Sequence, residues 1–307
     1  MSRVLVTGGA GFIGSNVVRA LLERGDDVRI LDNFSTGSRD NLAELDVEVV
    51  EGELRSYERV HAAVRGVEVV FHLGALGSVP RSVQDPLTSS AVNVEGTLNV
   101  LLAARDENVR RVVFSSSSSV YGSAGELPRT EEMAPDPISP FGVAKLAAER
   151  YCVSFSRVYE QFETVVLRYF NVFGPRQNPH TQYAAVVPLF ITQVACGEPV
   201  VVFGDGEQSR DFTYVANVVD ATLRAADAPG ATGRIFNVAA GKPASVNELA
   251  EAVGRILGKS VQKQSAPARP GDVRDSWADV SAARSELGYE AHVPLEEGLR
   301  LTIDALL

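Results

Sequence analysis

Short apolar runs alternate with longer amphipathic stretches along the first half of the chain. The apolar runs predict strands at residues 3–7, 28–31, 47–50, 67–73, 110–115 and 164–168. Helical patterns are predicted between them at about 12–24, 56–65, 86–106 and 141–159. Continuous apolar strands separated by helices are typical of a parallel sheet that is covered on both faces. We therefore expect an α/β protein with a doubly wound parallel sheet.

The pattern becomes less regular after about residue 171. The stretch N-V-F-G-P-R-Q-N-P-H is rich in turn-forming residues, residues 234–239 resemble one more strand, and residues 265–272 are predicted to be a loop. A length of 307 residues is enough for two domains. The change in pattern indicates that a second, smaller unit follows the sheet.

Composition and charge argue against several classes of protein. The chain is 45% apolar and 22% charged, as in ordinary globular proteins, and no run of eighteen apolar residues predicts a membrane span. The N-terminus shows no secretory leader pattern, so a cytoplasmic location is expected. Cys152 and Cys196 fit neither a disulfide framework nor a metal site, and we expect both to be reduced and buried. The net charge of −10 argues against a nucleic-acid or anionic membrane surface.

A glycine-rich turn links the first predicted strand to the first predicted helix. In T-G-G-A-G-F-I-G, glycines allow a tight turn and a close approach of the backbone to a pyrophosphate at the helix N-terminus. Asp32 ends the second predicted strand, where its carboxylate can bond the adenosine ribose hydroxyls and repel the extra phosphate of NADP. Together these features predict NAD binding.

The glycine spacing and six later motifs resemble one enzyme family. G-x-x-G-x-x-G is the spacing of the short-chain dehydrogenase/reductase superfamily, and the later segments resemble its extended branch. They are D-N-F-S-T-G at 32–37, H-L-G-A-L-G-S-V-P-R-S at 72–82, N-V-E-G-T at 93–97, S-S-S-S-S-V-Y-G at 115–122, R-Y-F-N-V-F-G-P-R-Q at 168–177 and G-D-G-E-Q-S-R-D-F-T-Y-V at 204–215. Within that branch the chain resembles the nucleotide-sugar 4-epimerases, of which the UDP-galactose 4-epimerases are typical.

The resemblance implies a domain organisation and an assembly. An NAD-binding Rossmann domain is expected over residues 1–171, joined by 212–239. A nucleotide-sugar-binding domain is expected from 172–211 and 240–307. Helices 86–106 and 141–159 match those that pair two subunits through a four-helix bundle, so a homodimer is expected.

The resemblance also assigns the ligand-binding residues. The residues expected to contact NAD are Gly8, Gly11, Phe12, Ile13, Gly14, Asp32, Asn33, Ser35, Gly37, Glu53, Leu54, Leu73, Gly74, Ala75, Asn93, Ser115, Lys145 and Phe170. The residues expected to contact a UDP-sugar are Ser78, Ser117, Asn171, Val186, Phe203, Arg210, Arg269, Asp272 and Ser276. The two arginines match a clamp on the pyrophosphate, for which a planar guanidinium is suited.

One substrate-binding position predicts which sugars fit. Ser276 occupies the position at which a bulky tyrosine excludes N-acetyl groups in the family. A serine leaves room there, so UDP-glucose, UDP-galactose and their N-acetylamino forms are all expected to fit. No metal is expected in the site.

The catalytic motif lacks one group. Ser117 matches the catalytic serine and Lys145 the catalytic lysine, but Phe141 stands where the family has the tyrosine that acts as base. A nearby lysine and a nicotinamide would lower the pKa of such a tyrosine. Three interpretations are open: an engineered replacement that retains intact substrate, a natural homologue that binds without catalysis, or an enzyme that uses another base, for which Tyr121 is the nearest candidate.

Related activities remain as alternatives. A sugar-nucleotide 4,6-dehydratase needs an Asp-Glu pair in the serine motif, where this chain has Ser118 and Ser119. UDP-glucuronate 4-epimerisation or decarboxylation, and NAD and nucleotide-sugar binding without turnover, are not excluded by the residues. The sequence thus predicts a UDP-sugar 4-epimerase whose activity is low in its present form because of Phe141.

Overall fold

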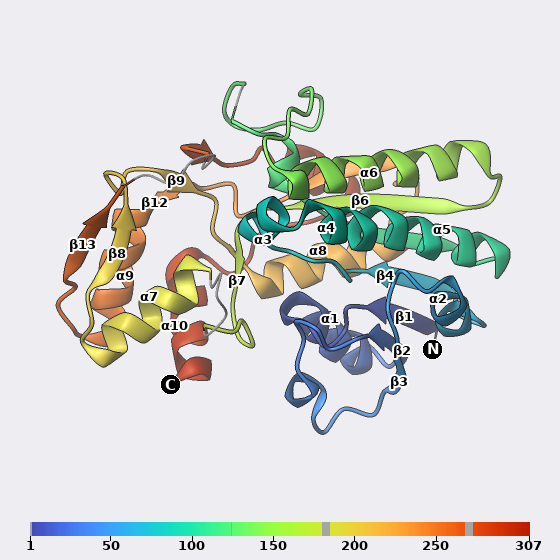
Figure 1. Cartoon of the computed structure of the whole chain (residues 1–307), viewed down its shortest axis with the longest axis horizontal. Helices are drawn as coiled ribbons and strands as arrows, with labels where there is room; N and C mark the ends of the chain where they lie inside the picture. The colour runs from blue at the N-terminus through green and yellow to red at the C-terminus, as the bar shows by residue number, and fades with distance from the viewer. Residues whose placement is uncertain (1, 124, 180–184, 268–272) are drawn as a thin grey trace.

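A seven-stranded parallel sheet forms the centre of the molecule (Figure 1). The computed structural model describes residues 2–123, 125–179, 185–267 and 273–307. The strand order is β11-β6-β5-β4-β1-β2-β3, and every neighbouring pair is parallel. The strands are β1 (Arg3–Thr7), β2 (Asp27–Asp32), β3 (Glu48–Glu51), β4 (Val69–His72), β5 (Arg111–Ser117), β6 (Glu163–Tyr169) and β11 (Arg234–Val238). The doubly wound α/β class is thereby confirmed.

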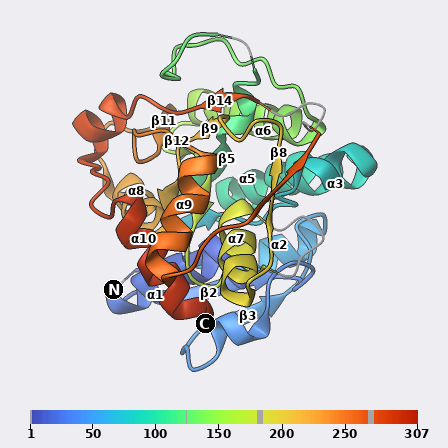
Figure 2. The same ribbon diagram turned by 90° about the vertical axis from the view of Figure 1, so that its left-hand side faces the viewer.

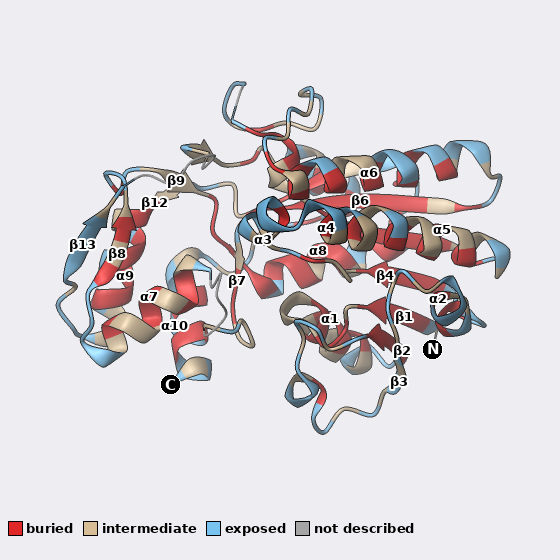
Figure 3. Ribbon diagram, viewed as in Figure 1, coloured by how far each residue is buried: buried red, intermediate tan, exposed pale blue. Residues whose placement is uncertain are grey.

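Helices cover both faces of this sheet because alternate strand residues point to opposite sides. Val4 and Val113 belong to the core shared with α1 (Phe12–Glu23) and α8 (Val215–Asp227). Leu5 and Val112 belong to a second core with α2 (Tyr57–Val64), α5 (Gly96–Asp106) and α6 (Pro140–Val158). The central strands β1, β4 and β5 are buried except at Arg3, which begins β1, and Ser117, which ends β5 (Figure 3).

The helix expected over residues 86–106 has a break in its regular winding. It consists of α4 (Pro86–Ser90), a π-helical turn η2 (Ala91–Glu95) and α5. A short helix α3 (Val79–Gln84), which the apolar pattern did not predict, precedes it. Ser78 caps this helix by accepting the N–H of Arg81, and Pro80 suits its first turn.

The C-terminal half contributes short strands and three helices that lie to one side of the large sheet (Figures 1 and 2). The small sheets pair β7 (Val172–Phe173) with β10 (Thr213–Tyr214), β8 (Val200–Phe203) with β13 (Lys263–Ala266), and β9 (Ser209–Arg210) with both β12 (Ala244–Ser245) and β14 (Asp275–Ser276). The helices are α7 (Val186–Cys196), α9 (Val246–Leu257) and α10 (Leu295–Leu306), and a short helical turn, η4 (Ala283–Leu287), precedes α10. Two further short turns, η1 (Arg39–Leu42) and η3 (Ser118–Val120), lie in the N-terminal half.

Two expectations about this half are wrong. Residues 265 and 266 are not loop but the end of β13, because their backbone pairs in parallel with Val202 and Phe203 of β8. Cys152 is buried as expected, but Cys196 is exposed. Cys196 ends α7 immediately before Gly197, whose left-handed conformation terminates the helix at the surface.

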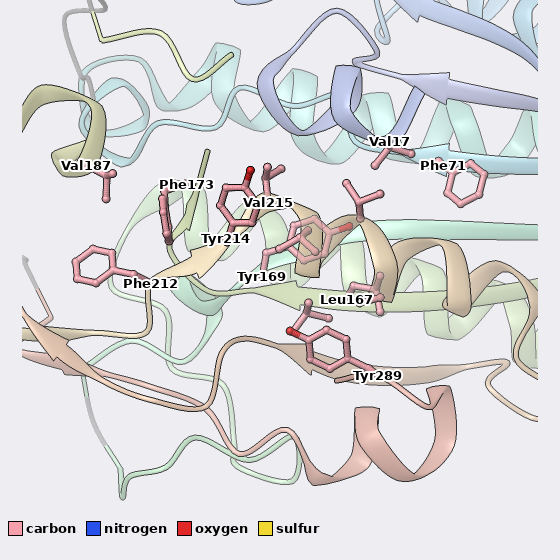
Figure 4. Packing of buried hydrophobic residues seen from close by; sticks show 14 of the residues in the cluster. Val17, Phe71, Leu167, Tyr169, Phe173, Val187, Phe212, Tyr214, Val215 and Tyr289 are labelled. Carbon is pink, nitrogen blue, oxygen red and sulfur yellow. The ribbon is translucent and has the colours of Figure 1, made fainter. Parts of the chain in front are cut away.

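One continuous hydrophobic core joins the two parts of the chain. Figure 4 shows Phe173, Val187 and Phe212 from the C-terminal half in the same cluster as Val17 and Phe71 from the sheet side. The elements of the C-terminal half therefore rest directly on the sheet. Among the described residues, no helix has both the length and the apolar character needed to cross a bilayer.

Candidate functional site

The carboxyl ends of β1 and β4 meet at the glycine-rich turn. Gly8 has a φ of +70°, and a Cβ there would lie 2.7 Å from the Cα of Gly74, in the loop after β4. A Cβ on Gly14 would lie 2.1 Å from the carbonyl oxygen of Gly8. Both positions therefore require glycine, and the two loops pack with no side chain between their backbones.

This turn fits a dinucleotide such as NAD. The first turn of α1 has no side-chain cap, so the N–H groups of Phe12 and Ile13 have no partner within the helix and are suited to a pyrophosphate. Asp32 accepts the N–H of Ala10 at 2.9 Å and that of Phe34 at 2.8 Å. Each of its carboxylate oxygens can accept a further bond, so ribose hydroxyls could bind there.

The residues expected beside adenosine lie together at one edge of this turn. Asn33 accepts the N–H of Ser35 at 3.1 Å, and its amide lies 3.5 Å from the carboxylate of Glu53. That carboxylate is paired with Arg55 at 2.6 Å. A Cβ on Gly37 would lie 2.7 Å from the backbone of Ala10, so this loop also packs on the glycine turn.

The loop after β4, which carries Leu73, Gly74 and Ala75, is held by one buried amide. Asn93 accepts the N–H of Leu76 at 2.8 Å and donates to its carbonyl oxygen at 3.2 Å. Asn93 lies in the π-helical turn η2, a type of irregularity found often at functional sites. Its amide fixes the path of the backbone along which the cofactor is expected to lie.

His72 is a buried residue of this region that the sequence did not single out. Its Nδ1 lies 2.7 Å from the hydroxyl of Thr7 and its Nε2 lies 3.0 Å from that of Thr97. Burial lowers the pKa of His72 to about 3, and the charge of Lys145 acts in the same direction. The imidazole is therefore neutral at physiological pH and links β1, β4 and α5.

The serine side chains at the end of β5 lie in two different environments. Ser117, at the end of β5, is half-buried; its Oγ accepts the N–H of Ser119 and lies 3.1 Å from the hydroxyl of that residue. Ser116 points the other way and donates to Glu149 at 2.5 Å. Glu149 also accepts two bonds from Arg168, at 2.8 and 2.9 Å, within the protein interior. Ser116 thus completes a buried ion pair.

Lys145 and Phe141 lie one helical turn apart at the start of α6. The Nζ of Lys145 donates to the carbonyl oxygen of Ser115 at 2.7 Å, and it lies 4.8 Å from the centroid of the Phe114 ring. Burial lowers the pKa of Lys145 to about 8, although the Glu149 carboxylate acts in the opposite direction. Ser115 thus meets the lysine through its backbone.

The backbone of Phe141 is fixed by a hydrogen bond from its N–H to the hydroxyl of Ser82, at 3.1 Å. Ser139 caps the same helix end by accepting the N–H of Gly142. Position 141 is therefore held in place by its backbone, and its ring is 7% exposed.

Tyr121 does not replace the missing hydroxyl. Its hydroxyl donates to the side-chain oxygen of Asn237 at 2.7 Å, and its ring is 2% exposed beside the guanidinium of Arg168. Burial raises the pKa of Tyr121 to about 12. A phenol that donates a hydrogen bond to a core amide and resists ionisation has a structural role.

The residues expected to bind the nucleotide are brought together only in part. Arg210 in β9 and Ser276 in β14 pair in register, and Arg210 donates to the carbonyl oxygens of Ser209 and Arg274. Phe203 ends β8 and Val186 begins α7. The expected contacts Arg269 and Asp272 lie outside the described residues.

The other expected contacts differ in exposure. Ser78 caps α3, Asn171 is exposed with a φ of +30°, and Phe170 is fully buried in a small cluster with Tyr121. Leu54 packs beneath α5, and a Cβ on Gly96 would lie 2.7 Å from the Cβ of Leu54. Phe170 and Leu54 therefore support the walls of the site.

Comparison with known proteins places this architecture in a family. The model of the NAD dependent epimerase/dehydratase family matches residues 4–239. The chain belongs to this family. It is 39% identical to the UDP-glucose 4-epimerase of Mycolicibacterium smegmatis, over 98% of this chain and 97% of that protein.

Solved structures agree over nearly the whole length. The UDP-glucose 4-epimerase of Thermotoga maritima with UDP-glucose is 39% identical and superimposes with a TM-score of 0.95, over 99% of this chain and 98% of that one. The UDP-N-acetylglucosamine 4-epimerase of Methanobrevibacter ruminantium, in complex with UDP-N-acetylmuramic acid, is 38% identical with a TM-score of 0.94, over 99% and 97% of the two chains. The similarity to these epimerases therefore includes the C-terminal half, beyond the residues that the family model matches.

This epimerase/dehydratase family member has a further acidic residue in its C-terminal half that the sequence did not single out. Asp211 follows Arg210 and is fully buried. Its carboxylate accepts the N–H groups of Ala240 at 2.8 Å, Gly241 at 3.0 Å and Ala278 at 3.3 Å. It therefore ties the loop after β11 and the segment after β14 to β9, the strand that carries Arg210.

Proposed function

We propose that this chain is an NAD-dependent UDP-sugar 4-epimerase whose turnover in the present form is low because of Phe141. Its substrates are UDP-glucose and UDP-galactose, together with UDP-N-acetylglucosamine and UDP-N-acetylgalactosamine. The observation that carries this proposal is full-length similarity to 4-epimerases for UDP-glucose and UDP-N-acetylglucosamine, at 38–39% identity. A shared sheet alone would support only a cofactor, whereas the similarity extends through the C-terminal half.

In this proposal, NAD supplies the redox chemistry when bound, since it can accept a hydride from C4 of the sugar and return it. Ser117 holds the C4 oxygen with its half-buried hydroxyl, and Lys145 bonds the nicotinamide ribose from one turn below position 141. The glycine turn and Asp32 hold the other end of the cofactor. A general base at position 141 is missing.

The substrate assignment rests on the pairing of β9 with β14. Arg210 and the undescribed Arg269 would bind the pyrophosphate, with Asn171 beside them. Ser276 lies in register with Arg210, so the residue proposed to set the pocket size is adjacent to the residue proposed to bind phosphate. A serine leaves space for an acetamido group.

We also propose a homodimer formed through helices 86–106 and 141–159. Apolar side chains stand exposed on these helices: Leu87 is 83% exposed, Val158 67% and Val143 54%. Exposed apolar residues that recur along two neighbouring helices are typical of an interface. We keep the domain boundaries at 1–171 with 212–239, and 172–211 with 240–307; the place of β11 in the large sheet supports the first of these. The proposed location is the cytoplasm.

Phe141 favours a second candidate function, in which the protein binds NAD and a nucleotide sugar without turnover. Phenylalanine has no ionisable group, so the general-base step cannot use this side chain. The two candidates share the same ligands and differ only in catalysis.

The test starts from the purified protein. Denaturing extraction should release NAD, and the protein should convert UDP-glucose to UDP-galactose slowly, with UDP-N-acetylglucosamine and UDP-glucuronate assayed in parallel. A protein that neither contains nor binds NAD contradicts both candidates. Binding of NAD and UDP-glucose without any conversion supports the second candidate. If the protein converts UDP-glucuronate alone, UDP-glucuronate is the substrate in place of UDP-glucose.

A further inference from the structure

The catalytic motif of this chain contains a titratable residue, Lys145, close to Phe141. The Nζ of Lys145 is 6.0 Å from the centroid of the Phe141 ring, on the same face of α6. The side chain is 4% exposed. Its hydrogen-bond acceptor in the described protein is the carbonyl oxygen of Ser115. An ammonium has three donors, whereas a neutral amine has two and gains a lone pair that can accept a proton.

The surroundings of Lys145 provide little compensation for a positive charge. On α6, Glu149 is occupied by Arg168 and Ser116, and the Cys152 thiol is held neutral because burial raises its pKa. On β4, His72 is neutral. On β5, the ring of Phe114 and the Ser115 carbonyl face the lysine. A tyrosinate at position 141 would favour the ammonium, but phenylalanine cannot.

We propose that Lys145 is the proton acceptor of this chain, taking the place of the hydroxyl that Phe141 lacks. The inference rests on the epimerase function proposed above. It assigns to Lys145 a role in proton transfer, in addition to binding the ribose of the cofactor. Burial, which lowers the pKa of Lys145 to about 8, keeps a working fraction of the amine neutral.

The step balances in atoms and charge. The lone pair of the neutral amine takes the proton of the C4 hydroxyl, directly or through one hydroxyl such as that of Ser117. The electron pair of the broken O–H bond forms the C4 carbonyl, and hydride leaves C4 for the nicotinamide of NAD. When hydride returns to the other face of C4, the Lys145 ammonium gives its proton back to the oxygen.

The proposal predicts how the rate depends on pH. With a pKa of about 8, roughly a tenth of the lysine is neutral at pH 7 and roughly nine tenths at pH 9. The slow turnover of the Phe141 protein should therefore rise about tenfold between these values and then level off. A rate that is flat or falls over this range overturns the proposal.

A titration that needs no turnover provides the second readout. The chain has only four lysines, at positions 145, 242, 259 and 263, so a protein labelled with ¹³Cε-lysine gives four signals. Replacing Lys242, Lys259 and Lys263 by arginine leaves the Lys145 signal alone. In the NAD-bound protein with UDP, that signal should titrate near pH 8, and in Phe141→Tyr its midpoint should move up. A midpoint at or above the usual lysine value overturns the proposal.

Lys145→Arg tests the role in catalysis, since arginine keeps the charge but does not release its proton. It should lower the residual turnover of the Phe141 protein by ~10²-fold or more and have a smaller effect in the Phe141→Tyr background. Equal losses in both backgrounds contradict a base role. If Phe141→Tyr converts no UDP-sugar, the proposed function itself fails; if it is active while Lys145 titrates as an ordinary lysine, only the present inference fails.

Discussion

The Nζ of Lys145 lies 6.0 Å from the ring of Phe141 but 4.8 Å from that of Phe114, so the ring nearest to the ammonium comes from the strand and not from the helix. This geometry keeps Lys145 in place whether or not position 141 carries a hydroxyl. The charge that would activate a phenol is present, and the phenol is absent.

Phe141→Tyr should therefore raise epimerase activity strongly. A positioned general base contributes ~10²–10⁴-fold, and Ser117 and Lys145 are already placed for it. The measurement is kcat for UDP-glucose and UDP-N-acetylglucosamine, with Phe141→Leu as the control that removes the ring without adding a hydroxyl. A tyrosine protein as slow as the original on every UDP-sugar would show that the site is defective elsewhere or the function is wrong.

Ser276→Tyr should narrow the range of substrates. A phenol ring beside Arg210 would fill the space proposed for an acetamido group, because the two residues pair in register. Binding of UDP-N-acetylglucosamine should fall at least tenfold while UDP-glucose is little affected, as titration calorimetry can measure. Ser276→Ala controls for loss of the hydroxyl, and an equal loss for both sugars in the tyrosine variant would remove Ser276 from pocket selection.

Asp211→Asn should weaken nucleotide binding without loss of NAD. In the asparagine an NH₂ group would face the backbone N–H donors of Gly241 and Ala278, so these two hydrogen bonds are lost while the one from Ala240 remains. A bond to a charged group is worth about 1.5–3 kcal/mol, or roughly ten- to a hundredfold in UDP affinity. Asp205→Asn, at an exposed position in the same half, is the matched control. Unchanged UDP affinity in Asp211→Asn would contradict this role.

Protonation of Asp211 should have opposite effects on UDP affinity and on the stability of the fold. Burial raises the pKa of Asp211 to about 6, although the backbone N–H groups act in the opposite direction. UDP affinity should therefore weaken below about pH 6, as the carboxylate gains a proton. Because the folded pKa is raised, protonation of this group favours the folded state as the pH falls, so loss of affinity should not be accompanied by unfolding from this source.

His72 should make the protein sensitive to acid. Its pKa is lowered to about 3 in the fold, so it contributes nothing to the pH dependence above its unfolded pKa of 6.5. Below that value His72 is protonated in the unfolded chain but not in the folded one, so the free energy of unfolding should fall by ~1.4 kcal/mol per pH unit. Urea unfolding between pH 7 and 5 measures this slope. It should become shallower in His72→Gln but not in the control His292→Gln, which changes an exposed histidine; equal slopes in all three proteins would rule out His72 as the cause.

The sequence predicted the large sheet because its signal is local. Each strand from β1 to β6 is an apolar run, and the glycine turn and Asp32 lie at fixed distances from those runs. The elements around Arg210 carry no such signal. β9, β12 and β14 have two residues each and form through pairing of segments distant in the chain, as Arg210 with Ser276.

The buried polar residues were missed for a related reason. Asp211 and Ser116 serve partners that only the fold brings near, the loop after β11 and Glu149 on α6. Helix α9 is different, since Ser245 and Glu248 form a capping box that can be read directly from the sequence. That helix could have been predicted from its cap.

The buried pair of Glu149 and Arg168 anchors α6 to β5 and β6 two turns beyond position 141. The scaffold around the site is therefore independent of which aromatic residue stands there. Phenylalanine and tyrosine codons differ by one base, so a single base change would convert Phe141 to tyrosine. That single change would add the hydroxyl that the proposed general base needs, without any repair of the fold.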